Sequence, residues 1–211
     1  MADFVGLAFE LAFKYRNPAI ILADGVIGQM MEKVVLPAQK PRRTDAEVIE
    51  QCPWATTGRT HHRTPNIITS LELDPAEMEK RNIHLQKKYA EIEENEVRFE
   101  ELHCEDSEYL IVAFGSCARI AQKAMEMARE EGIKVGLLRP ITLWPFPSKA
   151  IAARAAQVKG ILTVELNAGQ MVEDVRLAVK CKVPVEHFGR LGGIVPDPDE
   201  VITALKEKLI K

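Results

Sequence analysis

Four short apolar runs alternate with four helix-patterned segments in the last hundred residues of this chain. The runs are residues 109–114, 135–138, 161–164 and a shorter one at 183–185. A strand that is apolar on both faces must be covered on both faces, which is typical of a parallel sheet between two layers of helices. We therefore predict an α/β fold for residues 107–211, built as a three-layer, open and mainly parallel sheet.

The segments between the runs carry start and stop signals of helices. Gly115-Ser116 opens a predicted helix that Gly132 closes, and Asp197-Pro198 starts the last helix. Strands are expected at residues 109–114, 133–138, 161–166 and 184–187. The two other helices are expected from Ser148 to about Gln157 and through Met171, Val172, Val175 and Val179.

The N-terminal segment, residues 1–35, predicts a helix followed by a single strand. Asp3 can cap a helix that Asn17-Pro18 ends, and residues 19–23 are expected to form a buried strand that Asp24-Gly25 terminates. The helix has one apolar stripe: Phe4, Leu7, Ala8, Leu11, Ala12 and Tyr15. Because one strand cannot form a sheet, we expect residues 1–35 to be the last piece of a domain whose beginning is missing or supplied by another chain.

Residues 36–106 are predicted to be a loop followed by a helical connector. Prolines and sparse apolar residues indicate an irregular loop over residues 36–71, which either links domains or contacts a partner. Asp74-Pro75-Ala76-Glu77 has the pattern of a helix start. The helix is expected over residues 75–101, with or without a break near Asn82.

Charge is distributed unevenly along the chain. Residues 72–108 hold 13 acidic and 5 basic residues, a balance of −8, whereas residues 109–211 hold 15 basic and 11 acidic residues, a balance of +4. The acidic segment is either solvated and packed against its own basic domain, or it faces a basic partner subunit. The net charge of −3 gives no general affinity for nucleic acid.

The cysteines and histidines form no metal-binding pattern. Cys52, Cys104, Cys117 and Cys181 contain no C-x-x-C pair, so neither a zinc site nor an iron–sulfur cluster is predicted, and reduced, mostly packed thiols are expected. The adjacent pair His61-His62 would point apart and has no third ligand nearby. No metal site is therefore predicted.

No apolar run approaches the roughly 20 residues that cross a bilayer. Met1-Ala2-Asp3 also lacks the basic start of a signal peptide. A cytoplasmic protein is expected.

Two strand-to-helix turns, Gly115-Ser116 and Gly169-Gln170, place backbone amides where a phosphate could bind. Neither turn matches a dinucleotide or P-loop motif, so an ordinary turn explains each of them as well. The glycine-rich loop of residues 189–193 either clamps a ligand or makes a tight packing turn. These turns leave an alternative open, a stand-alone small-molecule or phosphate-binding α/β module.

No nucleophile–histidine or paired-carboxylate spacing commits the chain to catalysis, so no catalytic residue is assigned. Glu165 and Asp24 are expected at the carboxyl ends of strands, where functional groups of open α/β sheets lie. Trp144, framed by Pro145 and Pro147, is either a rigid anchor at an interface or a residue that covers the sheet.

Three strings in the sheet region carry a resemblance to a known family. They are YLIVAFGS (residues 109–116), GIKVGLLRPITLWPFP (residues 132–147) and VELNAGQM (residues 164–171). They look like the C-terminal domain of the α subunit of 2-oxoacid:ferredoxin oxidoreductases, nearest to the 2-oxoisovalerate members, a domain similar to the C-terminal domain of transketolase. Residues 8–18 and 21–25 resemble the end of the preceding thiamine-pyrimidine-binding domain.

The resemblance implies an enzyme that oxidatively decarboxylates a branched-chain 2-oxoacid, transfers the acyl group to coenzyme A and reduces ferredoxin. It implies thiamine diphosphate between the α subunit and a β subunit, with iron–sulfur clusters on other subunits or domains and with γ and ferredoxin-like subunits as further partners. The family's thiamine-activating glutamate and substrate-binding residues lie upstream of the matched part, so the cofactor-binding residues stay unknown. We expect a C-terminal fragment that supports assembly, binds no cofactor alone and is inactive alone.

Overall fold

The structure is a computed structural model that describes residues 1–39, 41–56, 58 and 66–210. It divides into two compact units. One unit is Met1–Ile21 with Glu32–Lys88, and the other is Leu22–Met31 with Tyr89–Lys211. The helix α4 (Pro75–Asn95) begins in the first unit and ends in the second.

The second unit is built around a five-stranded sheet with the strand order β1-β3-β2-β4-β5. Strands β2 to β5 run parallel, and β1 lies antiparallel to β3 at one edge. Tyr109 pairs with Val135 on one side and with Gly160 on the other, which makes β2 a central strand. The strands are β1 (Phe99–Leu102), β2 (Tyr109–Ala113), β3 (Val135–Pro140), β4 (Gly160–Glu165) and β5 (Val185–Gly189).

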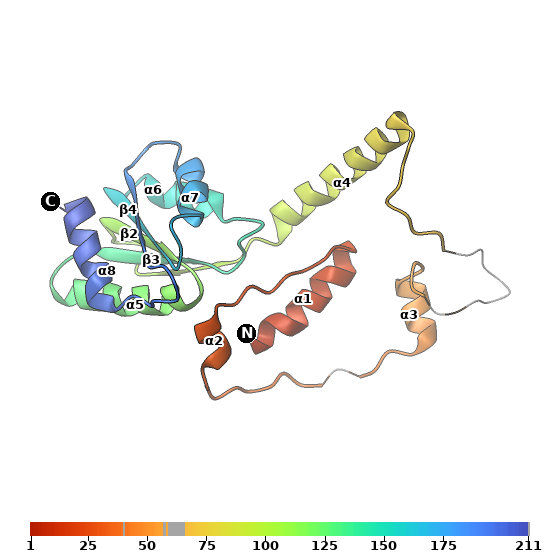
Figure 1. Ribbon diagram of the computed structural model, residues 1–211, viewed down its shortest axis with the longest axis horizontal. Coiled ribbons are helices and arrows are strands. Elements are labelled where there is room, and N and C mark those ends of the chain that lie inside the picture. The colour runs from red at the N-terminus through yellow and green to blue at the C-terminus, as the bar shows by residue number, and fades with distance from the viewer. Residues whose placement is uncertain (40, 57, 59–65, 211) are drawn as a thin grey trace. The chain divides into compact units, whose positions relative to one another are not determined.

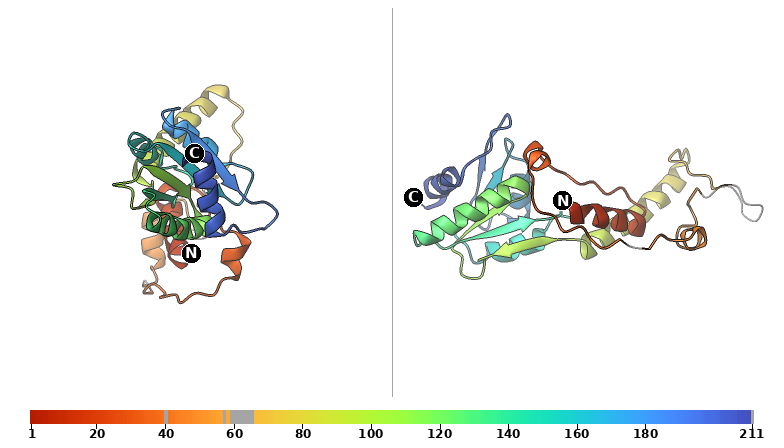
Figure 2. Two further views of the ribbon diagram at one scale, coloured as in Figure 1. Left: turned by 90° about the vertical axis from the view of Figure 1, so that its left-hand side faces the viewer. Right: turned by 90° about the horizontal axis from the view of Figure 1, so that it is seen from below.

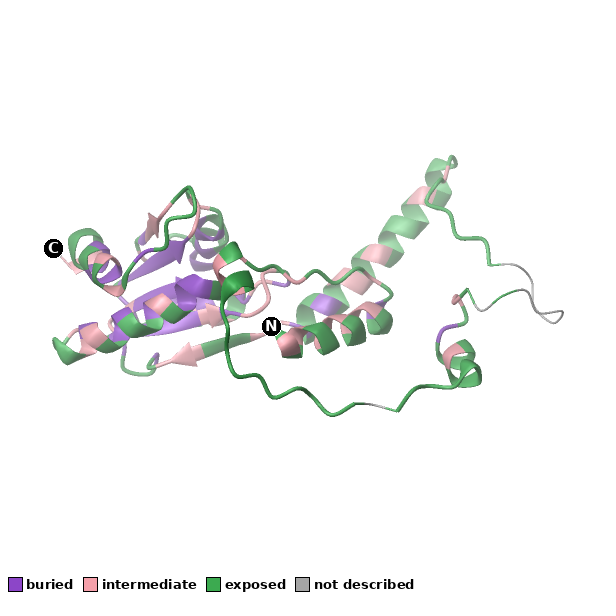
Figure 3. Ribbon diagram, turned by 60° about the horizontal axis from the view of Figure 1, so that its bottom comes forward, coloured by how far each residue is buried: buried purple, intermediate pink, exposed green. Residues whose placement is uncertain are grey.

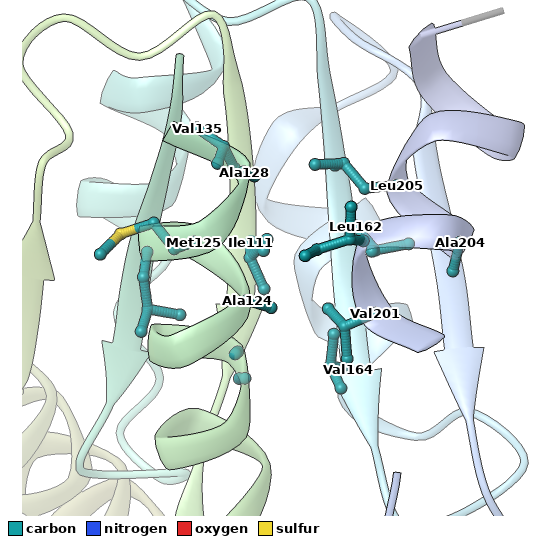
Figure 4. Packing of buried hydrophobic residues seen from close by; sticks show 14 of the residues in the cluster. Ile111, Ala124, Met125, Ala128, Val135, Leu162, Val164, Val201, Ala204 and Leu205 are labelled. Atoms are coloured by element: carbon teal, nitrogen blue, oxygen red, sulfur yellow. The ribbon is translucent and has the colours of Figure 1, made fainter. Parts of the chain in front are cut away.

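Helices cover both faces of this sheet (Figures 1 and 2). Helices α5 (Gly115–Glu130) and α8 (Pro198–Leu205) share a core with Ile111, and Figure 4 shows Met125, Leu162 and Leu205 in it. Helices α6 (Ser148–Ala155) and α7 (Met171–Val179) share the other core with Leu110. Neighbouring residues of β2 thus enter opposite cores, because side chains alternate along a strand. The predicted three-layer, mainly parallel α/β fold is confirmed.

The predicted end of the connector helix, at residue 101, is wrong. Helix α4 runs without a break but ends at Asn95, and Phe99–Leu102 form the edge strand β1 instead of a last helical turn. Glu96 is buried and pairs with Arg98 at 2.9 Å, while the amide of Arg98 donates to Thr142 Oγ1 at 3.0 Å. Thr142 and strand β3, which pairs with β1, lie about 40 residues further along the chain, so the helical spacing of the segment could not predict these contacts.

The acidic segment packs against its own domain, as one of the two interpretations predicted. Five of its carboxylates form ion pairs with Lys or Arg side chains of residues 129–159. The ion pairs are Glu100–Arg139 at 2.7 Å, Glu101–Arg154 at 2.6 Å, Glu94–Lys149 at 3.1 Å, Asp106–Arg129 at 2.5 Å and Glu108–Lys159 at 2.5 Å.

The first unit has a much smaller interior (Figure 3). It holds α1 (Ala2–Tyr15), α3 (Asp45–Gln51) and most of α4, with Tyr15 and Cys52 buried. Phe13 stacks on Trp54 with ring centroids 6.0 Å apart. Lys88 Nζ donates to Asn17 Oδ1 at 3.2 Å, which ties α4 to the end of α1.

Three expectations for the N-terminal part are wrong. Residues 19–23 form no strand, because no neighbouring strand pairs with them in the described part of the chain, and Ile20 is 80% exposed. Asp3 lies in the first turn of α1 and does not cap it. The predicted loop of residues 36–71 contains α3, which starts with a capping box between Thr44 and Glu47.

Residues 22–31 belong to the sheet unit and contain the short helix α2 (Gly25–Gln29). Asp24 therefore does not end a strand but caps this helix. Near the C-terminus of the chain, α8 continues into the π-helical turn η1 (Lys206–Ile210). Among the described residues, every helix is too short or too polar to span a membrane.

Candidate functional site

The side on which the chain adds its next strand changes between β2 and β4, which are parallel neighbours. Strand β2 leads through α5 to β3 on one side, whereas β4 leads through α7 to β5 on the other side. Open α/β sheets place functional groups at such a switch point, at the carboxyl ends of the two strands. The candidate site is therefore the pair of turns that follow β2 and β4, which we call the switch-point edge (residues 114–117 and 165–170).

Glu165 ends β4 and is 1% exposed at this edge. Its carboxylate accepts hydrogen bonds from the backbone amides of Gln170 at 3.1 Å, Met171 at 2.8 Å and Val172 at 3.0 Å. These amides open α7, whose own N-cap residue offers no side-chain bond. Glu165 lies at the predicted strand end, and its negative charge is stabilised by the N-terminus of α7.

A histidine that sequence reasoning did not single out lies beside Glu165. His187 Nδ1 lies 3.4 Å from Glu165 Oε1 and 3.3 Å from Thr163 Oγ1. Strand register brings Thr163 opposite His187 on β5. Only the pairing register of β4 and β5 could have identified this cluster of Thr163, Glu165 and His187, and the register cannot be read from the sequence.

Asp24 brings a second carboxylate to the switch-point edge from outside it. Its Oδ2 accepts from Ser116 Oγ at 2.8 Å, and its Oδ1 accepts from the Ile27 amide at 2.9 Å. Partial burial acts to raise the pKa of Asp24, but these hydrogen bonds outweigh it and hold the pKa below its ordinary value. The Asp24 carboxylate thus lies at the first turn of α5, although Asp24 precedes Ser116 by 92 residues.

Cys117, in the first turn of α5, is 3% exposed. Burial, followed by the negative charges of Asp24 and Glu165, raises the pKa of the Cys117 thiol to about 12. A thiol with this pKa stays protonated at neutral pH and is a poor nucleophile. Cys117 is therefore a packed residue, as expected from the sequence, and so are Cys52 and Cys104, whereas Cys181 is exposed.

The two turns considered for phosphate binding are each closed by a carboxylate of the chain itself. Glu165 occupies the amides after Gly169, and Asp24 occupies the turn at Gly115-Ser116. A phosphate or diphosphate would meet a like charge at both places. The described residues do not fit the diphosphate of thiamine diphosphate there, and the same charges argue against the stand-alone phosphate-binding module.

The described residues do not fit an iron–sulfur cluster either, because such a cluster needs several thiolates in one place. Cys117 and Cys104 belong to the cores on opposite faces of the sheet. In the ranges that the structure describes, no three His, Cys, Asp or Glu residues gather to hold a metal ion. His61 and His62 lie outside the described residues.

Gly189 is the last residue of β5 and the first of the glycine-rich segment 189–193, and it is closely packed. A Cβ atom there would lie 2.2 Å from the Asn167 carbonyl oxygen and 2.6 Å from His187 Nε2. Only glycine allows this close approach of β5 to the turn after β4. The packing interpretation of this loop is thus supported at its first residue.

Trp144 lies on the surface. It is 53% exposed and makes an edge contact with Tyr89, with ring centroids 5.8 Å apart. It is not a member of either sheet core, whereas Phe146 packs against one of them. The exposure argues against the interpretation that Trp144 covers the sheet.

Comparison with known proteins gives the class of this fold. Residues 107–201 match the family described as pyruvate:ferredoxin oxidoreductase core domain II. The solved 2-oxoglutarate:ferredoxin oxidoreductase from Magnetococcus marinus, with 2-oxoglutarate, coenzyme A and succinyl-CoA bound, has a TM-score of 0.60 and 25% identity. The match covers 70% of this chain and 28% of that one. Residues 107–201 therefore form a domain of the 2-oxoacid:ferredoxin oxidoreductase type.

Over 98% of its length the chain is homologous to the ketoisovalerate oxidoreductase subunit VorB. It is 45% identical to VorB of Methanothermobacter marburgensis over 210 residues, which are 98% of this chain and 57% of VorB. It is 31% identical to the 2-oxoglutarate synthase subunit KorA of Archaeoglobus fulgidus, with 90% of this chain and 53% of KorA covered. The chain thus spans little more than half the length of these relatives, and the predicted resemblance is confirmed.

Proposed function

We propose that this chain is the C-terminal part of the α subunit of a thiamine-diphosphate-dependent 2-oxoacid:ferredoxin oxidoreductase. The complex would convert a branched-chain 2-oxoacid to its acyl-CoA in the cytoplasm. The observation that carries the proposal is the 45% identity to VorB across 98% of the chain. Identity to KorA is 31%, which favours the ketoisovalerate branch over the 2-oxoglutarate branch.

We further propose that the chain supports assembly and holds no complete active site. The two carboxylates at the switch-point edge support this view, because they leave no turn there for a diphosphate. Thiamine diphosphate would be held with a β subunit, and electrons would pass to clusters on γ and ferredoxin-like subunits. Coenzyme A, which is bound in the Magnetococcus marinus relative, would be a substrate of the whole complex.

In this proposal the chain has three parts. Residues 1–35 would end a thiamine-pyrimidine-binding domain, residues 36–106 would connect, and residues 107–211 would form the domain related to the C-terminal domain of transketolase. The family match begins at residue 107, which supports the start of the third part at that residue.

Calorimetry and an activity assay test the proposal together. Thiamine diphosphate with Mg²⁺, titrated into the purified chain, should give no binding heat. The chain alone should not reduce a viologen dye with 2-oxoisovalerate and coenzyme A. Co-expression with the remaining subunits, and with the part of VorB that the chain does not span, should give a stable complex with this activity. Tight cofactor binding by the chain alone would contradict the supporting role.

The substrate branch is tested with the same complex. 2-Oxoisovalerate should have the higher kcat/KM when it is compared with 2-oxoglutarate. A preference for 2-oxoglutarate would reject the ketoisovalerate assignment and leave the enzyme class intact.

A further inference from the structure

Residues 22–31 belong to a different compact unit from the residues that flank them. The residues on both sides of this segment belong to the first unit, whereas residues 22–31 belong to the sheet unit. We call this segment the α2 strap. Its helix α2 has five residues, and a helix this short is not stable by itself in water. Contacts outside the helix must therefore hold it.

One carboxylate supplies the polar part of those contacts. Asp24 Oδ1 accepts from the Ile27 amide and caps α2, while Asp24 Oδ2 accepts from Ser116 Oγ in the first turn of α5. Each oxygen of Asp24 thus serves a different helix. Ser116 is 8% exposed, so its hydroxyl is largely withdrawn from water and needs an acceptor.

Gly115 adds the apolar part of the contact. Its Cβ position would lie 3.7 Å from Asp24 Oδ2 and 3.9 Å from Ile27 Cδ1, so the strap reaches van der Waals distance of the turn after β2. Gly115 has a φ of +58°, which glycine adopts readily and other residues rarely do. The N-cap residue of α5, Phe114, gives that helix no side-chain cap of its own.

We propose that the α2 strap folds and docks in one step, with Asp24 as the positioning residue that couples the two events. Helix α2 forms only while the Asp24 carboxylate bridges the Ile27 amide and the Ser116 hydroxyl. Release of the strap unfolds α2 and leaves the first turn of α5 without its acceptor. The strap is thus an order–disorder element at the carboxyl end of β2, and this inference does not depend on the reaction proposed above.

Hydrogen exchange of the full chain tests this coupling. Ser116→Ala removes the hydroxyl donor from α5 and changes no residue of the strap. If docking and folding are coupled, the amides of residues 25–31 should exchange roughly tenfold faster in this variant, since a hydrogen bond to a charged group is lost. Asp24→Ala should raise exchange in residues 25–31 and also in residues 115–118.

Asp197→Ala is the matched control, because Asp197 caps α8 through the Glu200 amide at 2.8 Å but lies outside the strap. It should leave exchange of residues 25–31 unchanged. Unchanged exchange of residues 25–31 in Ser116→Ala would overturn the proposal, as would unchanged exchange of residues 115–118 in Asp24→Ala. Asp24→Ala changes no residue of the sheet core, so it also serves if Ser116→Ala fails to fold.

Discussion

At the scale of single residues, Glu165 is a buried charge stabilised by its partners. Three backbone amides donate to its carboxylate, and His187 lies beside it. A buried carboxylate without such partners would be strongly destabilising. Glu165 therefore fixes the turn between β4 and α7 and the position of β5 at once.

Glu165→Gln should lower the free energy of unfolding by about 1.5–3 kcal/mol, because the amide group replaces one acceptor oxygen with a donor that faces backbone N–H groups. Urea unfolding followed by circular dichroism measures the change. Glu173→Gln on the exposed side of α7 is the control and should stay within about 0.5 kcal/mol of the parent chain. Equal effects of the two substitutions would show that Glu165 has no special role.

The four cysteines should differ in their reactivity. Burial raises the pKa of Cys117 to about 12 and that of Cys104 to about 11, so at pH 8 both are protonated, whereas Cys181 is exposed. Iodoacetamide labelling at pH 8, read by peptide mass spectrometry, should modify Cys181 long before Cys104 and Cys117. The denatured chain should label at all positions, and fast labelling of native Cys117 would contradict the described packing.

At the scale of elements, the turn after β4 and the strand β5 pack through backbone atoms. Gly189 has no room for a side chain, because the Asn167 carbonyl oxygen lies 2.2 Å from the position of a Cβ. The strand therefore reaches its neighbour only with glycine at this position. The same close approach keeps His187 beside Glu165.

Gly189→Ala should destabilise the chain by about 1–3 kcal/mol, because backbone must shift to admit the methyl group. Thermal unfolding should show a lower Tm. Gly28→Ala in α2 is the matched control: no atom lies within 4 Å of its Cβ position, and alanine favours a helix by up to about 1 kcal/mol. A Gly189→Ala variant as stable as the parent would mean that this approach is looser than described.

At the scale of the whole molecule, carboxylates paired within the sheet unit make stability depend on pH. The hydrogen bond from Arg129 lowers the pKa of Asp106, and the bond from Lys159 lowers that of Glu108. A carboxyl whose pKa is lower in the folded state stabilises the fold above its unfolded pKa. That contribution is lost as the pH falls through the folded pKa.

Stability should therefore be flat from pH 7 to about pH 5 and fall below about pH 4. Urea midpoints measured between pH 7 and pH 3 give the profile. The double variant Asp106→Asn with Glu108→Gln should fall less steeply in acid than the parent chain. A profile that rises below pH 4 would show that these ion pairs do not act as described.

The sequence alone predicted the elements whose pattern is local. Four apolar runs gave the parallel strands, and the helices from Gly115 and Asp197 followed from their start signals. Three strings, residues 109–116, 132–147 and 164–171, also indicated the family resemblance, which the 45% identity to VorB supports. The carboxylates Asp24 and Glu165 could be chosen as candidates from their positions after apolar runs.

Tertiary structure decided what depends on contacts between distant residues. Strand β1 exists because β3 offers an edge, and residues 19–23 form no strand because no strand in the described part of the chain pairs with them. His187 joins Glu165 only through strand register, and Asp24 reaches Ser116 across 92 residues. The periodicity of the sequence indicates which face of a helix or strand is apolar. The hydrogen-bond partners of a backbone segment or a carboxylate are decided only when the chain folds.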